Sequence, residues 1–129
     1  MHRPNNSVNQ SSLDLFSDLM NALLDRDLQA ALECGEAMAS IDTRERQKAW
    51  CAFMTDCFRK IFMIQQGLPQ IAYVSEFERD LFTSLAKRCP RQLSRRAVDL
   101  VDDAVMLLER NVSQKILFCD LVDRLYLSI

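Results

Sequence analysis

The sequence predicts an all-α fold, a compact bundle of about six helices. Glycine and proline are scarce, with two glycines and three prolines in 129 residues, so few positions interrupt a helix. Apolar residues recur at steps of three and four along most of the chain, which is the period of an amphipathic helix. A chain of this length buries about two-thirds of the surface that its unfolded form exposes. We therefore expect one domain that needs neither a disulfide nor a metal ion to fold.

The N-terminal segment differs in composition from the rest of the chain. Residues 1–11 are polar, rich in asparagine and contain Pro4, so we expect a disordered linker or lead-in. The helical domain is then expected to cover residues 12–129. Its first helix is predicted at residues 12–25, where Ser12 can cap the helix and the apolar residues share one face.

The second and third predicted helices have clear start signals. Asp27 is the expected cap of an alanine-rich helix at residues 27–40. Thr43 is the expected cap of the longest helix, at residues 43–66, which Gly67 ends. Two apolar rows run along this third helix, so we expect it to lie at the centre of the bundle.

Three more helices are predicted in the second half of the chain. A loop at residues 67–74 is apolar enough to pack onto the bundle. Ser75 and Glu78 form a capping box that opens the fourth helix, whose inward residues are predicted to include Phe77. The remaining boundaries are residues 75–88 for the fourth helix, 91–110 for the fifth after the Cys89-Pro90 break, and 113–129 for the sixth.

Charge and cysteine content exclude several classes of protein. The net charge of −2 gives no reason to expect nucleic-acid binding. The five cysteines form no CxxC pair, which indicates reduced core cysteines of a cytosolic protein. Neither a signal peptide nor a membrane-spanning run is present in the sequence. We therefore expect a cytoplasmic protein with no membrane partner.

The sequence contains no recognisable catalytic machinery. Its only histidine is His2, in the polar lead-in, so neither a cysteine–histidine nor a serine–histidine nucleophile can be assembled. It has no glycine-rich phosphate loop. The acidic pair Asp102-Asp103 is interpreted as a solvated helix face. We predict no catalytic residue, no cofactor, no metal site and no small-molecule substrate.

Residues 87–96 contain a cluster of basic side chains. One interpretation is a patch that contacts a phosphate backbone. The other is a helix C-terminus with favourable cations followed by an exposed helix start, and we favour it because no aromatic residue is interleaved. A third interpretation, contact with an acidic partner protein, is intermediate between these two. The cluster consists of Lys87, Arg88, Arg91, Arg95 and Arg96.

Aromatic residues are more numerous than one small core is expected to cover. Phe58, Phe62, Phe118 and Tyr126 lie beside the main apolar rows of their helices. If several of them are exposed together, they mark a surface for a protein partner.

The last two helices resemble a known family. Residues 109–121 are similar to the closing motif of clamp-loader subunits, in which an asparagine leads into a helix of the form K-[LIM]-x-[LF]-x-[DE]-[LF]. The match consists of Asn111, Lys115, Ile116, Phe118, Asp120 and Leu121.

Upstream residues resemble one branch of that family, the C-terminal domain of delta-prime subunits of bacterial DNA polymerase III. Residues 58–62 are followed by Gly67-Leu68-Pro69, by Tyr73 and by an acidic helix start at residues 75–80, in the order of that domain. Residues 23–27, leading into an alanine-rich helix, also fit its opening. The resemblance covers nearly all of residues 12–129.

The resemblance implies a collar domain. In such clamp loaders, the C-terminal helical domains associate into a pentameric ring, and the ATP-binding modules open the sliding clamp for DNA replication. Those modules have no counterpart in this sequence, so no catalytic residue is carried over. The expected partners are other clamp-loader subunits, with no direct nucleic-acid contact. The expected interface includes Phe58, Phe62, Asn111, Lys115, Phe118 and Tyr126.

Two other functions remain open. The chain could be a free-standing helical adaptor or regulatory domain that binds a different protein through the same apolar faces. It could also be a helical regulator that encloses a small molecule in an internal pocket, which would require an enclosed apolar cavity.

Overall fold

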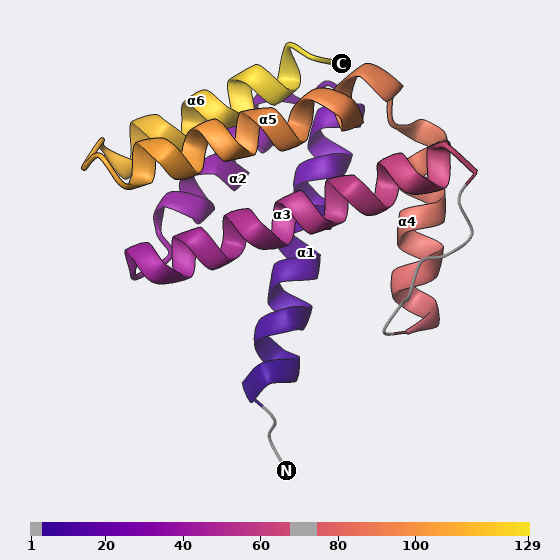
Figure 1. Ribbon diagram of the computed structural model, residues 1–129, viewed down its shortest axis with the longest axis horizontal. Helices are drawn as coiled ribbons and strands as arrows, with labels where there is room; N and C mark the ends of the chain where they lie inside the picture. The colour runs from indigo at the N-terminus through magenta and orange to yellow at the C-terminus, as the bar shows by residue number, and fades with distance from the viewer. Residues whose placement is uncertain (1–3, 68–74) are drawn as a thin grey trace.

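The chain is described by a computed structural model that covers residues 4–67 and 75–129. Within these ranges it is all-helical, with six helices and no strand, as the sequence predicts (Figure 1). The helices are α1 (Pro4–Leu24), α2 (Leu28–Ala39), α3 (Arg44–Gln65), α4 (Glu76–Arg88), α5 (Arg91–Leu108) and α6 (Gln114–Tyr126).

Side-chain caps determine where most of these helices start. In each case the side-chain oxygen accepts a hydrogen bond from the backbone N–H three residues further on, at 3.0–3.4 Å. Such a bond satisfies an amide that has no partner inside the helix. The capping residues are Asp27 for α2, Thr43 for α3, Ser75 for α4 and Ser113 for α6. The predicted caps Asp27, Thr43 and Ser75 are confirmed.

The first helix is longer than the sequence predicts. It begins at Pro4 rather than at Ser12, so residues 4–11 are helical where a disordered lead-in was expected. The reason is that proline is favourable in the first turn of a helix and no glycine or proline follows before Ser12. This first part of α1 projects away from the other helices in Figure 1.

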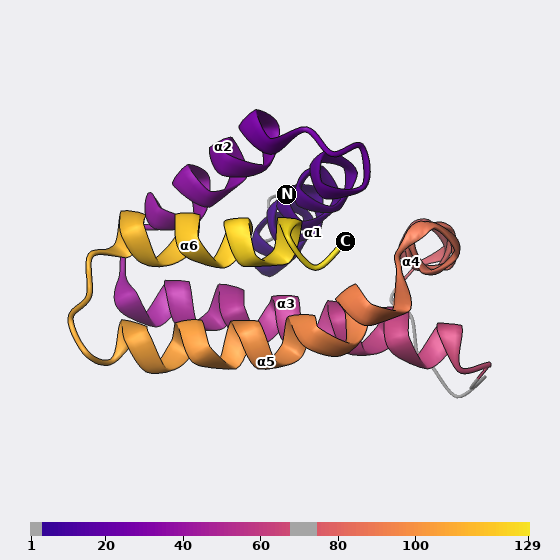
Figure 2. The same cartoon turned by 90° about the horizontal axis from the view of Figure 1, so that it is seen from above.

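The bundle is built from two main helix pairs. The most extensive contacts are between α3 and α5 and between α2 and α6. Figure 2 shows α2 and α6 on one side of the α3–α5 pair. α1 crosses this assembly, and α4 packs at the C-terminal end of α3 (Figure 1). The central position predicted for the third helix is confirmed, because α3 contacts α1, α2, α4 and α5.

Three aromatic side chains join α1, α3 and α4. Phe58 on α3 lies edge-on to Phe16 on α1, with ring centroids 5.2 Å apart. Phe82 on α4 is 6.1 Å from Phe16. All three rings are fully or almost fully buried, so they anchor the two outer helices to the central one.

One inward position predicted for α4 is wrong. Phe77 points outward and is 56% exposed, whereas Phe82 and Glu78 are buried. Glu78 accepts a hydrogen bond from Lys60 at 2.9 Å, and the Lys60 ammonium lies 5.6 Å from the centre of the Phe82 ring. This contact with α3 selects the row that contains Glu78 and Phe82 as the inner face, at the expense of Phe77.

Gln65 fixes the turn between α4 and α5. Its Nε2 donates to the carbonyl oxygens of Ala86 (3.1 Å) and Cys89 (2.7 Å), at the end of α4. Its Oε1 accepts from the hydroxyl of Ser94 on α5 at 2.6 Å. One glutamine at the end of α3 therefore holds both neighbouring helices. The helix stop predicted at Gly67 is also confirmed, because this residue has a φ of 75°.

Candidate protein-interaction surfaces

Two of the six residues predicted to contact a partner belong to the core. Phe58 and Phe118 have no exposed surface, so neither can contact another chain in this structure, and the prediction is wrong for both. The bundle encloses more aromatic surface than its length suggested, because Phe58 packs against Phe16 on α1 and α6 is packed against both α2 and α5.

Phe62 and Tyr126 are half-buried at the surface. The Tyr126 hydroxyl donates to the carbonyl oxygen of Arg26 at 3.3 Å, which ties the end of α6 to the turn between α1 and α2. Part of the Tyr126 side chain thus serves this contact. A partner role for both residues stays a prediction.

Asn111 and Lys115 are exposed and already have partners within the chain. Asn111 has a φ of 60°, a left-handed conformation that asparagine adopts more readily than most residues, and it forms the turn between α5 and α6. Its side-chain oxygen accepts from the Arg44 guanidinium. Lys115 lies 3.8 Å from the Glu36 carboxylate on α2. The asparagine of the resembling motif therefore has a conformational role here.

The exposed large apolar side chains are concentrated on α5 and α6. Three of them, Met106, Ile116 and Leu127, lie on or directly after these two helices, and we call them the hairpin surface. The full set with its exposed fractions is Leu28 37%, Phe77 56%, Met106 52%, Ile116 67% and Leu127 74%.

The expected interface omitted all three residues of the hairpin surface. For Ile116, the sequence did contain a pattern that indicates exposure. It precedes Asp120 and Asp123 by one and two helical turns, so it shares the polar, outward face of α6.

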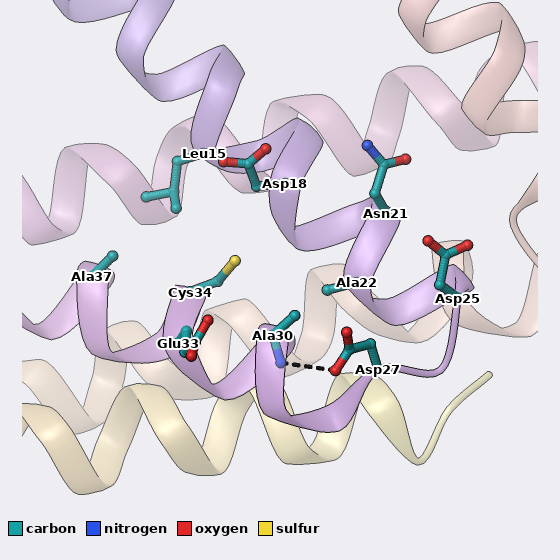
Figure 3. A pocket seen from close by; sticks show the side chains of 10 residues that line it. All are labelled: Leu15, Asp18, Asn21, Ala22, Asp25, Asp27, Ala30, Glu33, Cys34 and Ala37. Carbon is teal, nitrogen blue, oxygen red and sulfur yellow. Dashed lines mark hydrogen bonds between the residues drawn. The ribbon is translucent and has the colours of Figure 1, made fainter.

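An open groove separates the second half of α1 from α2. Figure 3 shows Leu15 on α1 and Ala30, Cys34 and Ala37 on α2 directed toward each other across it. The hollow has a volume of about 490 Å³ and is open to solvent. We call it the α1–α2 groove; its lining residues are Leu15, Asp18, Asn21, Ala22, Asp25, Asp27, Ala30, Glu33, Cys34 and Ala37.

Carboxylates line both walls of the α1–α2 groove. Asp25 forms an ion pair with Arg88 at 3.1 Å, and Asp27 is the cap of α2. Asp18 on α1 and Glu33 on α2 also line the hollow. Burial raises the pKa of the Cys34 thiol, and the charges of Asp18 and Glu33 raise it further. The groove is therefore an electronegative hollow with a small, apolar floor.

The basic cluster at residues 87–96 is partly used inside the chain. Arg88 pairs with Asp25, and Arg91 donates to the carbonyl oxygen of Gln65 at 3.3 Å. Lys87, Arg95 and Arg96 are exposed and form no ion pair with any residue that the structure describes.

The buried cysteines are poor nucleophiles. Burial raises the pKa of Cys51 to about 12 and that of Cys89 to about 11, so both thiols stay protonated near neutral pH. Over residues 4–67 and 75–129, no group of three or more histidine, cysteine, aspartate or glutamate side chains could hold a metal ion.

Comparisons with known proteins give no relative. A scan against protein-family models, a search of curated proteins and a search of solved structures all found no significant match. None of the helices in the described ranges combines the length and the apolar character needed to cross a lipid bilayer.

Proposed function

We propose that this chain is a non-catalytic assembly domain that packs against other protein subunits. The observation that carries the proposal is the hairpin surface, where Met106, Ile116 and Leu127 each expose more than half of their side chains. Burying such a side chain at an interface removes it from water and contributes about 1.5–3 kcal/mol. Three such residues on one helical hairpin favour a protein partner over isolated exposure.

Within that class, the proposal is specific: a domain like the collar domain of delta-prime subunits in bacterial DNA polymerase III clamp loaders. Support comes from the position of the resembling motif at residues 109–121, which contains Ile116 and the Asn111 turn of the same hairpin. The proposed partners are other clamp-loader subunits in a cytoplasmic replication complex. The domain itself would transfer no group and hydrolyse no nucleotide.

The test is co-purification of this chain with candidate clamp-loader subunits, followed by sedimentation of the complex. We expect the double variant Ile116→Ser/Leu127→Ser to weaken assembly at least about tenfold, because two exposed apolar contacts are lost. The matched control is Phe77→Ser, which removes an apolar side chain that is also more than half exposed, on α4.

The control variant should assemble like the wild type, and all three proteins should unfold at similar temperatures. Equal weakening by Phe77→Ser and by the hairpin variant would contradict a specific interface on α5 and α6. Failure of the wild-type chain to bind any clamp-loader subunit, with binding of an unrelated protein through the same hairpin, would replace the collar proposal with the adaptor alternative.

A further inference from the structure

We propose that the α1–α2 groove binds a basic helix of another protein. The partner helix would carry lysine or arginine on both sides of a row of small or apolar side chains. This docking site lies on α1 and α2, apart from the hairpin surface, and does not depend on the proposed function.

The floor of the groove is shaped for close approach of a helix. Ala30, Cys34 and Ala37 follow one another at steps of four and three along α2, so they form a single row of small side chains. The neighbouring position on α2 shows how closely a helix can approach such residues. At Gly35, a Cβ atom would lie only 3.3 Å from the carbonyl oxygen of Phe118 on α6. The row of Ala30, Cys34 and Ala37 beside Gly35 has similar small residues but faces the open groove.

The length of the floor sets the size of the contact. From Ala30 to Ala37 the α2 axis advances about 10 Å, at 1.5 Å per residue. An occupant can therefore lay about two helical turns along the row. The hollow of about 490 Å³ accommodates side chains of such a segment and is too open to enclose a small molecule.

The charges on the walls identify the chemistry of the partner. Asp18 and Glu33 lie on opposite sides of the floor, and neither forms an ion pair with a described residue. Among the residues that the structure describes, Arg88 is the one cation paired at the groove, at the Asp25 end. Carboxylates on both walls attract a helix with cations on both flanks and repel the phosphates of a nucleic acid. Charge complementarity thus selects a basic protein segment.

The experiment measures binding of a labelled synthetic helical peptide by fluorescence anisotropy. The peptide presents one row of alanine and leucine flanked by two rows of lysine, and a second peptide has the same composition in scrambled order. We expect the ordered peptide to bind the wild-type chain more tightly than the scrambled one, because only the ordered peptide matches both the floor and the walls.

Two double variants with the same change in net charge separate the groove from general attraction. Asp18→Asn/Glu33→Gln should weaken binding about tenfold, whereas Asp99→Asn/Asp102→Asn, on exposed positions of α5, should change it less than about twofold. Equal effects of the two variants, or equal binding of the two peptides, would show nonspecific attraction and overturn the proposal.

A third variant tests the floor without changing the charge. Ala37 is exposed, so Ala37→Trp can fill the groove while the domain stays folded, which a melting curve verifies. This variant should lose most of the binding; wild-type affinity would place the peptide elsewhere and end the proposal. The hairpin variant Ile116→Ser/Leu127→Ser should bind the peptide normally. That result distinguishes failure of this inference from failure of the assembly role.

Discussion

The two faces of α2 both carry small residues, but one face is closed by another helix and the other lines an open groove. On one face, Gly35 lies against α6 so closely that a Cβ atom would be 3.2 Å from Val122. On the other, Ala30, Cys34 and Ala37 line an open groove. Small side chains are present on both faces, so residue size does not decide which face is closed.

The opposing helix makes the difference. α6 brings the buried, apolar Phe118 and Val122 to the Gly35 face, and their removal from water favours contact. α1 brings Asp18 to the other face, opposite Glu33. Closing that side would remove two carboxylates from water without a cation to compensate them. A row of small residues therefore brings helices together only when the surface opposite can be dehydrated.

The largest effect is expected from filling the closed face. Gly35→Leu should lower the free energy of unfolding by about 2–3 kcal/mol, because overpacking against α6 outweighs the gain in helix propensity. Ala37→Leu, two residues away on the open face, should change it by less than about 0.5 kcal/mol. Urea unfolding of both variants measures the difference. Similar losses in the two variants would show that the two faces are equally closed.

A second contrast compares neighbouring glutamines at the end of α3. Gln65→Ala should cost about 2 kcal/mol, because it leaves the carbonyl oxygen of Cys89 and the buried hydroxyl of Ser94 without this partner. Gln66→Ala, at an exposed position, is the control and should cost less than about 0.5 kcal/mol. Equal thermal stability of the two variants would remove Gln65 as the link between α4 and α5.

Counted per pH unit, the smallest effect is expected at alkaline pH. Burial raises the pKa of Cys51 from its usual 9.0 to about 12, so below pH 9 the thiol is protonated in both folded and unfolded chains. Above pH 9 the unfolded chain releases this proton and the folded chain does not. Stability should therefore fall as pH rises from 9 toward 12, by up to about 1.4 kcal/mol per pH unit.

Variants at two cysteines measure that contribution. Cys51→Ala should flatten the decline of unfolding free energy between pH 9 and pH 11. Cys34→Ala should flatten it less, because Cys34 lies at the floor of the open groove and keeps some exposed surface, whereas Cys51 is fully buried. Denaturant titrations at several pH values give the slopes. Unchanged slope in Cys51→Ala would show that ionisation of this thiol is not linked to unfolding.

Much of the fold could be predicted from local sequence. The caps Asp27, Thr43 and Ser75 start helices because each side chain bonds an amide three residues away, and no distant contact is needed. The all-helical class likewise follows from the apolar period. The start of α1 was missed because asparagine and serine weakly disfavour helix, and a polar composition does not by itself prevent one.

The surfaces were harder to predict. Phe58 and Phe118 resembled interface residues because each lies beside the main apolar row of its helix, yet other helices cover both. Phe77 was predicted to point inward on α4 but is exposed, since the Lys60–Glu78 contact favours burial of the row that contains Glu78. Both errors concern which helix lies opposite, a question that a single amphipathic pattern leaves open.

The amino-acid sequence by itself determined the helical class, most helix boundaries and the charge of each helix face, because these depend on residues within a few positions of one another. Only the tertiary structure decided that Leu127 stays exposed while Phe118 is enclosed, and that Ala30, Cys34 and Ala37 face a groove. The physical reason is that burial depends on the surface that a second helix presents, and that surface comes from a distant part of the chain.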